Sequence, residues 1–375
     1  MEQWITDVYY IAMGIYRIPE HFGIRFKDEG MVVRNALTRK EVLYVEHPAE
    51  EEVYKRFDDR FVVLRGPKGD GLSMVALAAL TRKILHDRAV VVDAIAARDC
   101  LNDVTSLLKV VDSIRDVGRE PVFYLDLSRP GHYPQKPWEG VGYSPAEFKK
   151  FVDALENVEY VSRNKSVTAI AVISDDLYGI LKRLKEHVAV EVNSNDARFL
   201  GELAQVYSGC GEDVAAEIAK TIVAKHDCGR AVLATLAADW LARRSCRGTV
   251  AEALQAAEDK AVELFIDYIW HTVLNGDRPY ANLHAPLFLL RHFEGPVPAE
   301  SAKEFLISLG FEKYKIRNSM AVKWLAMHHC NLIESAVKKA VETALTKRID
   351  KQPYSALRSA AVDYHKHFKA RGYFK

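Results

Sequence analysis

Residues 61–73 read Phe-Val-Val-Leu-Arg-Gly-Pro-Lys-Gly-Asp-Gly-Leu-Ser. The first four are apolar, which predicts a buried strand, and the part that follows has the frame of the phosphate-loop motif G-x-x-x-x-G-K-[ST]. Backbone N–H groups of such a loop cradle phosphates, and its lysine reaches the outer ones. Gly66, Gly71 and Ser73 stand on motif positions, but Leu72 stands where the lysine belongs. The segment therefore predicts a nucleotide-binding fold with an altered phosphate site.

Strand and helix patterns alternate from residue 60 to 194, which is typical of a parallel sheet covered by helices on both faces. Continuous apolar runs indicate strands that are buried on both sides. Strands are expected at Phe61–Leu64, Ala89–Val92, Val122–Leu125, Val167–Ile173 and Val188–Val192. Helices are expected at Leu72–His86, Cys100–Val117, Pro145–Val161 and Asp176–His187. The predicted fold class is α/β, with a five-stranded parallel sheet that carries the P-loop.

The pattern divides the chain into four parts. Residues 1–55 form an N-terminal extension with short strands near 31–33 and 42–45. They are followed by a P-loop NTPase-like α/β domain over 56–194, a small all-helical unit over 195–248, and a mostly helical, basic domain over 249–375.

Composition favours a soluble, cytoplasmic protein. No apolar run approaches the roughly 18–20 residues of a membrane helix, and the N-terminus lacks the pattern of a signal peptide, so no membrane partner is expected. The five cysteines are odd in number and show no C-x-x-C spacing, so neither a disulfide framework nor a zinc site is predicted. Few glutamines beside many Lys, Arg and Glu favour a thermophile.

Two of the predicted strands end in polar residues. Asp126 follows the run Val122–Leu125 in the form of an acid that holds Mg²⁺ through water. Ser174 follows the run Val167–Ile173, where a polar side chain would face the outer phosphate. Asp175 and Asp176, which come next, have an equally good explanation as caps of the next helix.

This order of parts resembles the AAA+ and STAND branch of P-loop ATPases. Within that branch it is most similar to archaeal AAA-type ATPases and, more distantly, to archaeal replication initiator ATPases. The resemblance covers roughly residues 50–246 and implies ATP or ADP with Mg²⁺ as the cofactor. It assigns the phosphate cradle to Gly66, Gly69, Gly71 and Ser73, and Lys68 and Leu72 complete the predicted nucleotide-binding residues. It also implies that the sheet is of the ASCE type, that residues 195–248 are a helical lid, and that residues 249–375 form a winged-helix-like domain.

The same resemblance implies further roles in the site. Ser73 and Asp126 would hold Mg²⁺, Ser174 would be the first sensor, and Arg230 in the segment 228–233 the second. Arg183 would be an arginine finger for a neighbouring subunit in an oligomer, although residues 182–185 are also explained as a solvated helix face.

Two departures from the family pattern favour a degenerate ATPase with weak or absent hydrolysis. Leu72 supplies no charge and would place an apolar group beside phosphate oxygens, and Leu127 stands where a catalytic glutamate is expected. Loss of one charged hydrogen bond costs about 1.5–3 kcal/mol. One alternative is a slow ATPase in which Lys68 replaces the lysine and Arg183 acts in trans. Another is a scaffold that binds a partner protein through the aromatic loop 129–143.

The C-terminal part is basic: residues 303–375 hold 15 Lys and Arg against 6 Asp and Glu, whereas the whole chain has a net charge of +1. Two helices at Pro298–Leu309 and Ser319–His329 form a possible DNA-binding pair. The lysines and arginine that would contact DNA are Lys313, Lys315, Arg317 and Lys323. Solvated helix faces explain the same charges without DNA.

Overall fold

The computed structural model describes residues 15–16, 24–27, 30–35, 37–94, 103–126, 145–175, 187–270, 281–316 and 320–374. The chain forms two compact units. Unit 1 comprises residues 1–138 and 149–258, and unit 2 comprises residues 139–148 and 259–375. No helix among the described residues combines the length and apolar character needed to cross a membrane.

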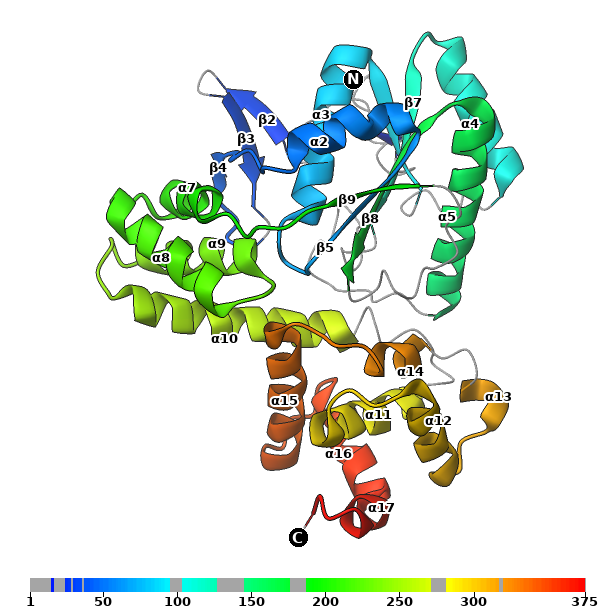
Figure 1. The fold of residues 1–375 in the computed structure, drawn as a ribbon, viewed down its shortest axis with the longest axis vertical. Helices are drawn as coiled ribbons and strands as arrows, with labels where there is room; N and C mark the ends of the chain where they lie inside the picture. The colour runs from blue at the N-terminus through cyan, green and yellow to red at the C-terminus, as the bar shows by residue number, and fades with distance from the viewer. Residues whose placement is uncertain are drawn as a thin grey trace. The chain divides into compact units, whose positions relative to one another are not determined.

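Unit 1 is organised around a six-stranded sheet in the order β1-β6-β7-β8-β5-β9 (Figure 1). Its strands are β1 (Ile15–Tyr16), β5 (Phe61–Gly66), β6 (Ala89–Asp93), β7 (Glu120–Asp126), β8 (Thr168–Ser174) and β9 (Val188–Glu191). Strands β5 to β9 run parallel and confirm the five predicted strands. β1 pairs antiparallel with β6 as a sixth strand that the sequence pattern does not predict. Because Gly66 pairs with Ser174, and Asp126 with Val172, the polar strand ends share the carboxyl edge of the sheet.

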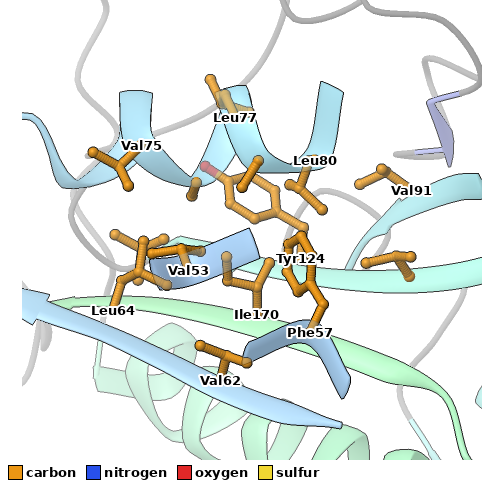
Figure 2. Close-up of a cluster of buried hydrophobic side chains, with 14 of the residues drawn as sticks. Val53, Phe57, Val62, Leu64, Val75, Leu77, Leu80, Val91, Tyr124 and Ile170 are labelled. Carbon is orange, nitrogen blue, oxygen red and sulfur yellow. The ribbon is translucent and has the colours of Figure 1, made fainter. Parts of the chain in front are cut away.

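The core of unit 1 lies between one face of this sheet and two helices, α2 (Glu50–Lys55) and α3 (Leu72–Asp87). Alternate residues of each strand enter it, as the strand period of two requires. In Figure 2 the Tyr124 ring lies between the α3 side chains and the sheet. The labelled side chains of this core are Val53, Phe57, Val62, Leu64, Val75, Leu77, Leu80, Val91, Tyr124 and Ile170. Each large apolar side chain buried in this way contributes about 1.5–3 kcal/mol.

Two further helices contribute to unit 1, the first entirely and the second from Lys149 onward. The helix α4 (Val104–Asp116) contacts β7 and begins where the Asp103 carboxylate accepts the Ser106 N–H at 2.8 Å. The helix α5 spans Pro145–Lys165, one turn longer than predicted. The helix predicted over 176–187 lies almost entirely outside the described residues.

The N-terminal extension is built into the core of unit 1. Its antiparallel sheet joins β2 (Ile24–Lys27), β3 (Gly30–Arg34) and β4 (Glu41–Leu43), and Ile24 and Val33 are buried in the core cluster. Farther along, the buried Glu50 accepts the Tyr44 hydroxyl at 2.6 Å and pairs with Arg82 of α3 at 3.1 Å. The extension is therefore fixed to α3 by apolar packing and by an ion pair.

The helical lid consists of α7 (Ala197–Ser208), α8 (Glu212–Lys225) and α9 (Arg230–Ala242) (Figure 1). A disulfide joins Cys210, after α7, to Cys246, after α9. The sequence predicted no disulfide framework and gave no indication of this single bond. Pairing requires that two cysteines approach in space, here with Cα atoms 5.8 Å apart, and neither cysteine count nor spacing along the chain reveals that distance.

Every regular element among the described residues of unit 2 is a helix. After α10 (Val250–Tyr268), which begins in unit 1, come α11 (Ala281–Glu294), α12 (Ala299–Ser308), α13 (Lys313–Ile316), α14 (Met320–Leu325), α15 (Asn331–Thr346), α16 (Tyr354–Asp363) and α17 (His365–Ala370). The β-hairpin that makes the wing of a winged helix is therefore not seen in the described part of this unit.

The predicted helix pair of unit 2 differs from the observed one in its second member. α12 matches the first helix, but α14 ends at Leu325 and the short α13 precedes it. The reason is the fully buried Arg291 of α11, which donates to the carbonyl oxygens of Leu325 and Met327 at 2.7 and 2.8 Å and pairs with Glu334. These carbonyls are held by a side chain, so the helix does not continue to residue 329.

Candidate nucleotide site

The loop between β5 and α3 has the glycine geometry of a phosphate cradle. Gly69 and Gly71 have φ angles of +84° and +93°, which residues with a Cβ rarely adopt. A Cβ on Gly66 would lie 1.9 Å from the carbonyl oxygen of Val192, so this position requires glycine as well. Gly71 precedes the 16-residue helix α3 and has no side chain to cap its first N–H groups. Such a helix start favours an anion.

Leu72 directly follows Gly71 of the cradle as the first residue of α3. Its side chain is 3% exposed and belongs to the core cluster with Leu64 and Val75. The side chain at the predicted lysine position therefore packs in the core of unit 1. Lys68 and Ser73 are half-buried, and each makes contacts within the chain.

The other predicted residues lie along the carboxyl edge of the sheet. Ser174, at the end of β8, is fully buried beside Gly66 in the strand register. Asp126, at the end of β7, is 5% exposed and accepts the Tyr124 hydroxyl at 2.7 Å. Hydroxyl and carboxylate oxygens are ligands that Mg²⁺ takes, so Ser73 and Asp126 fit this ion by their chemistry.

Asp70, inside the loop, is fully buried and holds the lid. Its Oδ1 accepts the backbone N–H of Arg230 at 2.8 Å, and its Oδ2 accepts the backbone N–H of Ser194 at 3.1 Å. The Arg230 guanidinium lies 3.4 Å from the same carboxylate and also donates to Asn193 Oδ1 and to the His226 carbonyl. The structure thus places the predicted second sensor against an acid of the loop.

A second chain of contacts reaches the loop from the N-terminal extension. The Ala49 N–H donates to His47 Nδ1 at 3.0 Å, so the ring carries its hydrogen on Nε2, which lies 3.2 Å from Ser194 Oγ. That hydroxyl donates to the carbonyl oxygen of Asp70 at 2.7 Å. The His47 ring packs edge-on against Phe199 of the lid at 4.7 Å between ring centres.

Burial moves the pKa values of this network in opposite directions. It raises the pKa of the Asp70 carboxyl to about 6, although hydrogen bonds from Arg230 and Ser194 and the Arg230 charge oppose the rise. It lowers the pKa of His47 to about 4. Both effects follow from the cost of placing a charge away from water.

Sequence reasoning missed Asp70, Ser194, Asn193 and His47. The one available signal was Asp70 itself, since an acid within a phosphate loop repels phosphate. The other three are recognised only from the fold, because 124 residues separate Asp70 from Ser194.

Several predicted residues remain untested by this structure. Leu127, the loop 129–143, Arg183 and Arg317 lie outside the described residues, and the Lys315 side chain is not described. Lys313 and Lys323 are exposed on α13 and α14.

Comparison with known proteins yields fold neighbours only. No family model and no curated protein matches the chain. Among solved structures, a point mutant of Thermotoga maritima RuvB is 14% identical over 73% of this chain and 84% of its own, with a TM-score of 0.35. ORC2 of Aeropyrum pernix is 11% identical over 88% and 87%, with a TM-score of 0.38. A replication initiator DnaA bound to AMPPCP and single-stranded DNA is 11% identical over 85% and 96%, with a TM-score of 0.33.

These identities and TM-scores transfer no ligand or activity to the chain. The fold itself is visible in the sheet, whose five parallel strands carry the glycine loop after β5 and polar residues at the ends of β7 and β8. The chain has an α/β fold in which five parallel strands and the antiparallel β1 form one sheet.

Proposed function

We propose that this chain is a degenerate AAA+-like P-loop module that binds ATP or ADP weakly, hydrolyses little or none, and works as a nucleotide-sensing or assembly component. The observation that supports it most directly is the combination of a retained glycine cradle with Leu72 buried in the core. The cradle can still offer N–H groups to a phosphate. The position that should carry the lysine offers packing instead.

Weak affinity follows from the charges that remain. The backbone of the loop and the start of α3 attract phosphate without any side chain. The missing lysine removes about 1.5–3 kcal/mol, which corresponds to roughly one to two decades in dissociation constant. Lys68 is the loop's remaining cation, four residues before Leu72.

Weak hydrolysis follows from the residues that would prepare the attacking water. Bound Mg²⁺ would neutralise phosphate charge, and Ser73 and Asp126 are the residues that would hold it. Asp126 already accepts the Tyr124 hydroxyl, so one of its oxygens is engaged within the chain. The next residue in the sequence is Leu127, which has no group that accepts a proton.

The test is a calorimetric titration with ATP and ADP, each with Mg²⁺, of the wild type and two variants at one position. Leu72→Lys restores the charge, and Leu72→Met is the matched control that changes the side chain without adding charge. We expect binding that is 10-fold to 100-fold tighter in Leu72→Lys and unchanged in Leu72→Met. Circular dichroism verifies that each variant is folded. If no folded variant binds either nucleotide, the proposal is wrong.

The basic unit 2 supports a role at DNA within this proposal. Lys313 and Lys323 are exposed, and the end of the chain that contains them carries a strong excess of positive charge. Fluorescence anisotropy with a DNA duplex at several salt concentrations tests it. Lys313→Gln with Lys323→Gln should weaken binding and lower the salt slope by about 2, or roughly 1 per lysine. Lys338→Gln with Lys339→Gln on α15 is the charge-matched control; equal effects of both pairs would refute a specific role.

A further inference from the structure

The start of α9 is capped by the loop and not by its own sequence. Gly229 precedes this helix and has no side chain to accept an N–H. The Arg230 N–H donates to the Asp70 carboxylate at 2.8 Å, and the Val232 N–H donates to the Gly69 carbonyl at 3.1 Å. An anion at a helix start is favoured by the helix dipole. The loop therefore gives α9 the anion that a bound ligand or a capping residue would otherwise supply.

The charge of Arg230 is neutralised by the same carboxylate. Its side chain is 9% exposed and that of Asp70 is 0% exposed, so water screens their attraction only weakly. Bonds to the His226 carbonyl at 2.8 Å and to Asn193 Oδ1 at 3.0 Å fix the guanidinium in this position. Asp70 and Arg230 therefore balance each other's charge within the chain, without a bound ligand.

We propose that Asp70 is an internal anion that locks the lid onto the loop without nucleotide and competes with nucleotide phosphate for Arg230 and for the start of α9. The competition rests on the proposed function, since it concerns the same cradle. A phosphate that enters the loop meets a negative charge between Gly69 and Gly71, and Arg230 is already engaged. The lid contact is therefore autoinhibitory: nucleotide and the Asp70–Arg230 pair exclude each other.

The test is a titration with ATP and with ADP on the full chain, with variants that remove either partner. Asp70→Asn keeps the size of the side chain and leaves Arg230 as an uncompensated cation beside the loop, so nucleotide should bind at least 10-fold more tightly. Arg230→Gln should not bind more tightly, and the double variant should lose the gain made by Asp70→Asn. Asp213→Asn, at an exposed acid of α8, is the control for the change in net charge.

Amide hydrogen exchange at Arg230 and Val232 is the second readout and needs no nucleotide. Exchange should be at least 10-fold faster in Asp70→Asn than in the wild type, and unchanged in Asp213→Asn. If Leu72→Lys binds nucleotide while Asp70→Asn binds like the wild type, the competition is refuted and the proposed function stands. If exchange at the two amides is unaffected by Asp70→Asn, the lock is refuted. Absence of binding in every folded variant, Leu72→Lys included, overturns both proposals.

Discussion

Burial lowers the pKa of His47 and raises that of Asp70. The two residues should therefore change the free energy of unfolding with pH in opposite directions. His47 is neutral in the fold because its Nδ1 accepts the Ala49 N–H and its ring is buried, which lowers its pKa from 6.5 to about 4. Asp70 is buried, which raises its pKa from 3.8 to about 6. Replacing either residue by a neutral analogue removes one of the two opposing contributions.

The sign of each contribution follows from proton binding. The native state binds a proton at His47 less readily than the unfolded state, so the stability that this residue contributes is present above pH 6.5 and is lost as the pH falls through 4. Asp70 behaves in the opposite way: its contribution is present below pH 3.8 and is lost as the pH rises through 6. Each amounts to about 3 kcal/mol, and between about pH 4 and 6 the two nearly cancel.

Urea unfolding at several pH values between about 4 and 7 tests these contributions. The measured quantity is the free energy of unfolding of each variant minus that of the wild type. The free energy of unfolding of Asp70→Asn, relative to the wild type, should fall by about 3 kcal/mol as the pH drops from about 6.5 to 4. That of His47→Gln should rise by a similar amount over the same range. Differences of the same sign for the two buried positions, or a flat curve for Asp70→Asn, would refute the reasoning.

Two further predictions concern the close backbone contact at Gly66 and the disulfide between Cys210 and Cys246. Gly66→Ala should destabilise unit 1 by about 3 kcal/mol or more in urea unfolding, because its Cβ would lie 1.9 Å from the Val192 carbonyl oxygen. Gly201→Ala in α7 is the control. Its Cβ would meet only ordinary contacts, so it should stabilise the protein by about 0.5–1 kcal/mol. Replacement of both Cys210 and Cys246 by alanine should cost about 3–4 kcal/mol, because the disulfide closes a segment with a separation of 36 residues. A loss below about 1 kcal/mol would mean that the unfolded lid is not constrained by this link.

The parallel sheet could be predicted from the sequence because its signals are local. The strand Phe61–Gly66 is buried on both faces, so its first four residues are all apolar. Gly69 and Gly71 stand where the backbone turns left-handed, which few other residues tolerate. These features depend on each segment alone, and the structure reproduces them.

The missed features depend on residues that are distant in the sequence. β1 has only two residues, and what makes it a strand is its pairing with β6. α14 ends early because Arg291, 34 residues before its end, holds the Leu325 carbonyl. The contact between Asp70 and Arg230 spans 160 residues and joins two elements that were predicted separately. The hydrophobic periodicity of a segment carries no information about such long-range contacts.

The glycines of the cradle also have structural roles that do not require a nucleotide. Gly66 allows the backbone after β9 to approach β5, and the Gly69 carbonyl caps α9. Leu72 adds an apolar side chain to the core, and Asp70 gives Arg230 a partner within the chain. On the proposed function, an apolar residue at position 72 and an acid at position 70 share one consequence: the chain itself, and not a bound phosphate, stabilises the closed loop. Leu72→Lys adds a positive charge for the phosphate, and Asp70→Asn removes the negative charge that competes with it. The variant that combines both should therefore bind nucleotide more tightly than any other variant described above.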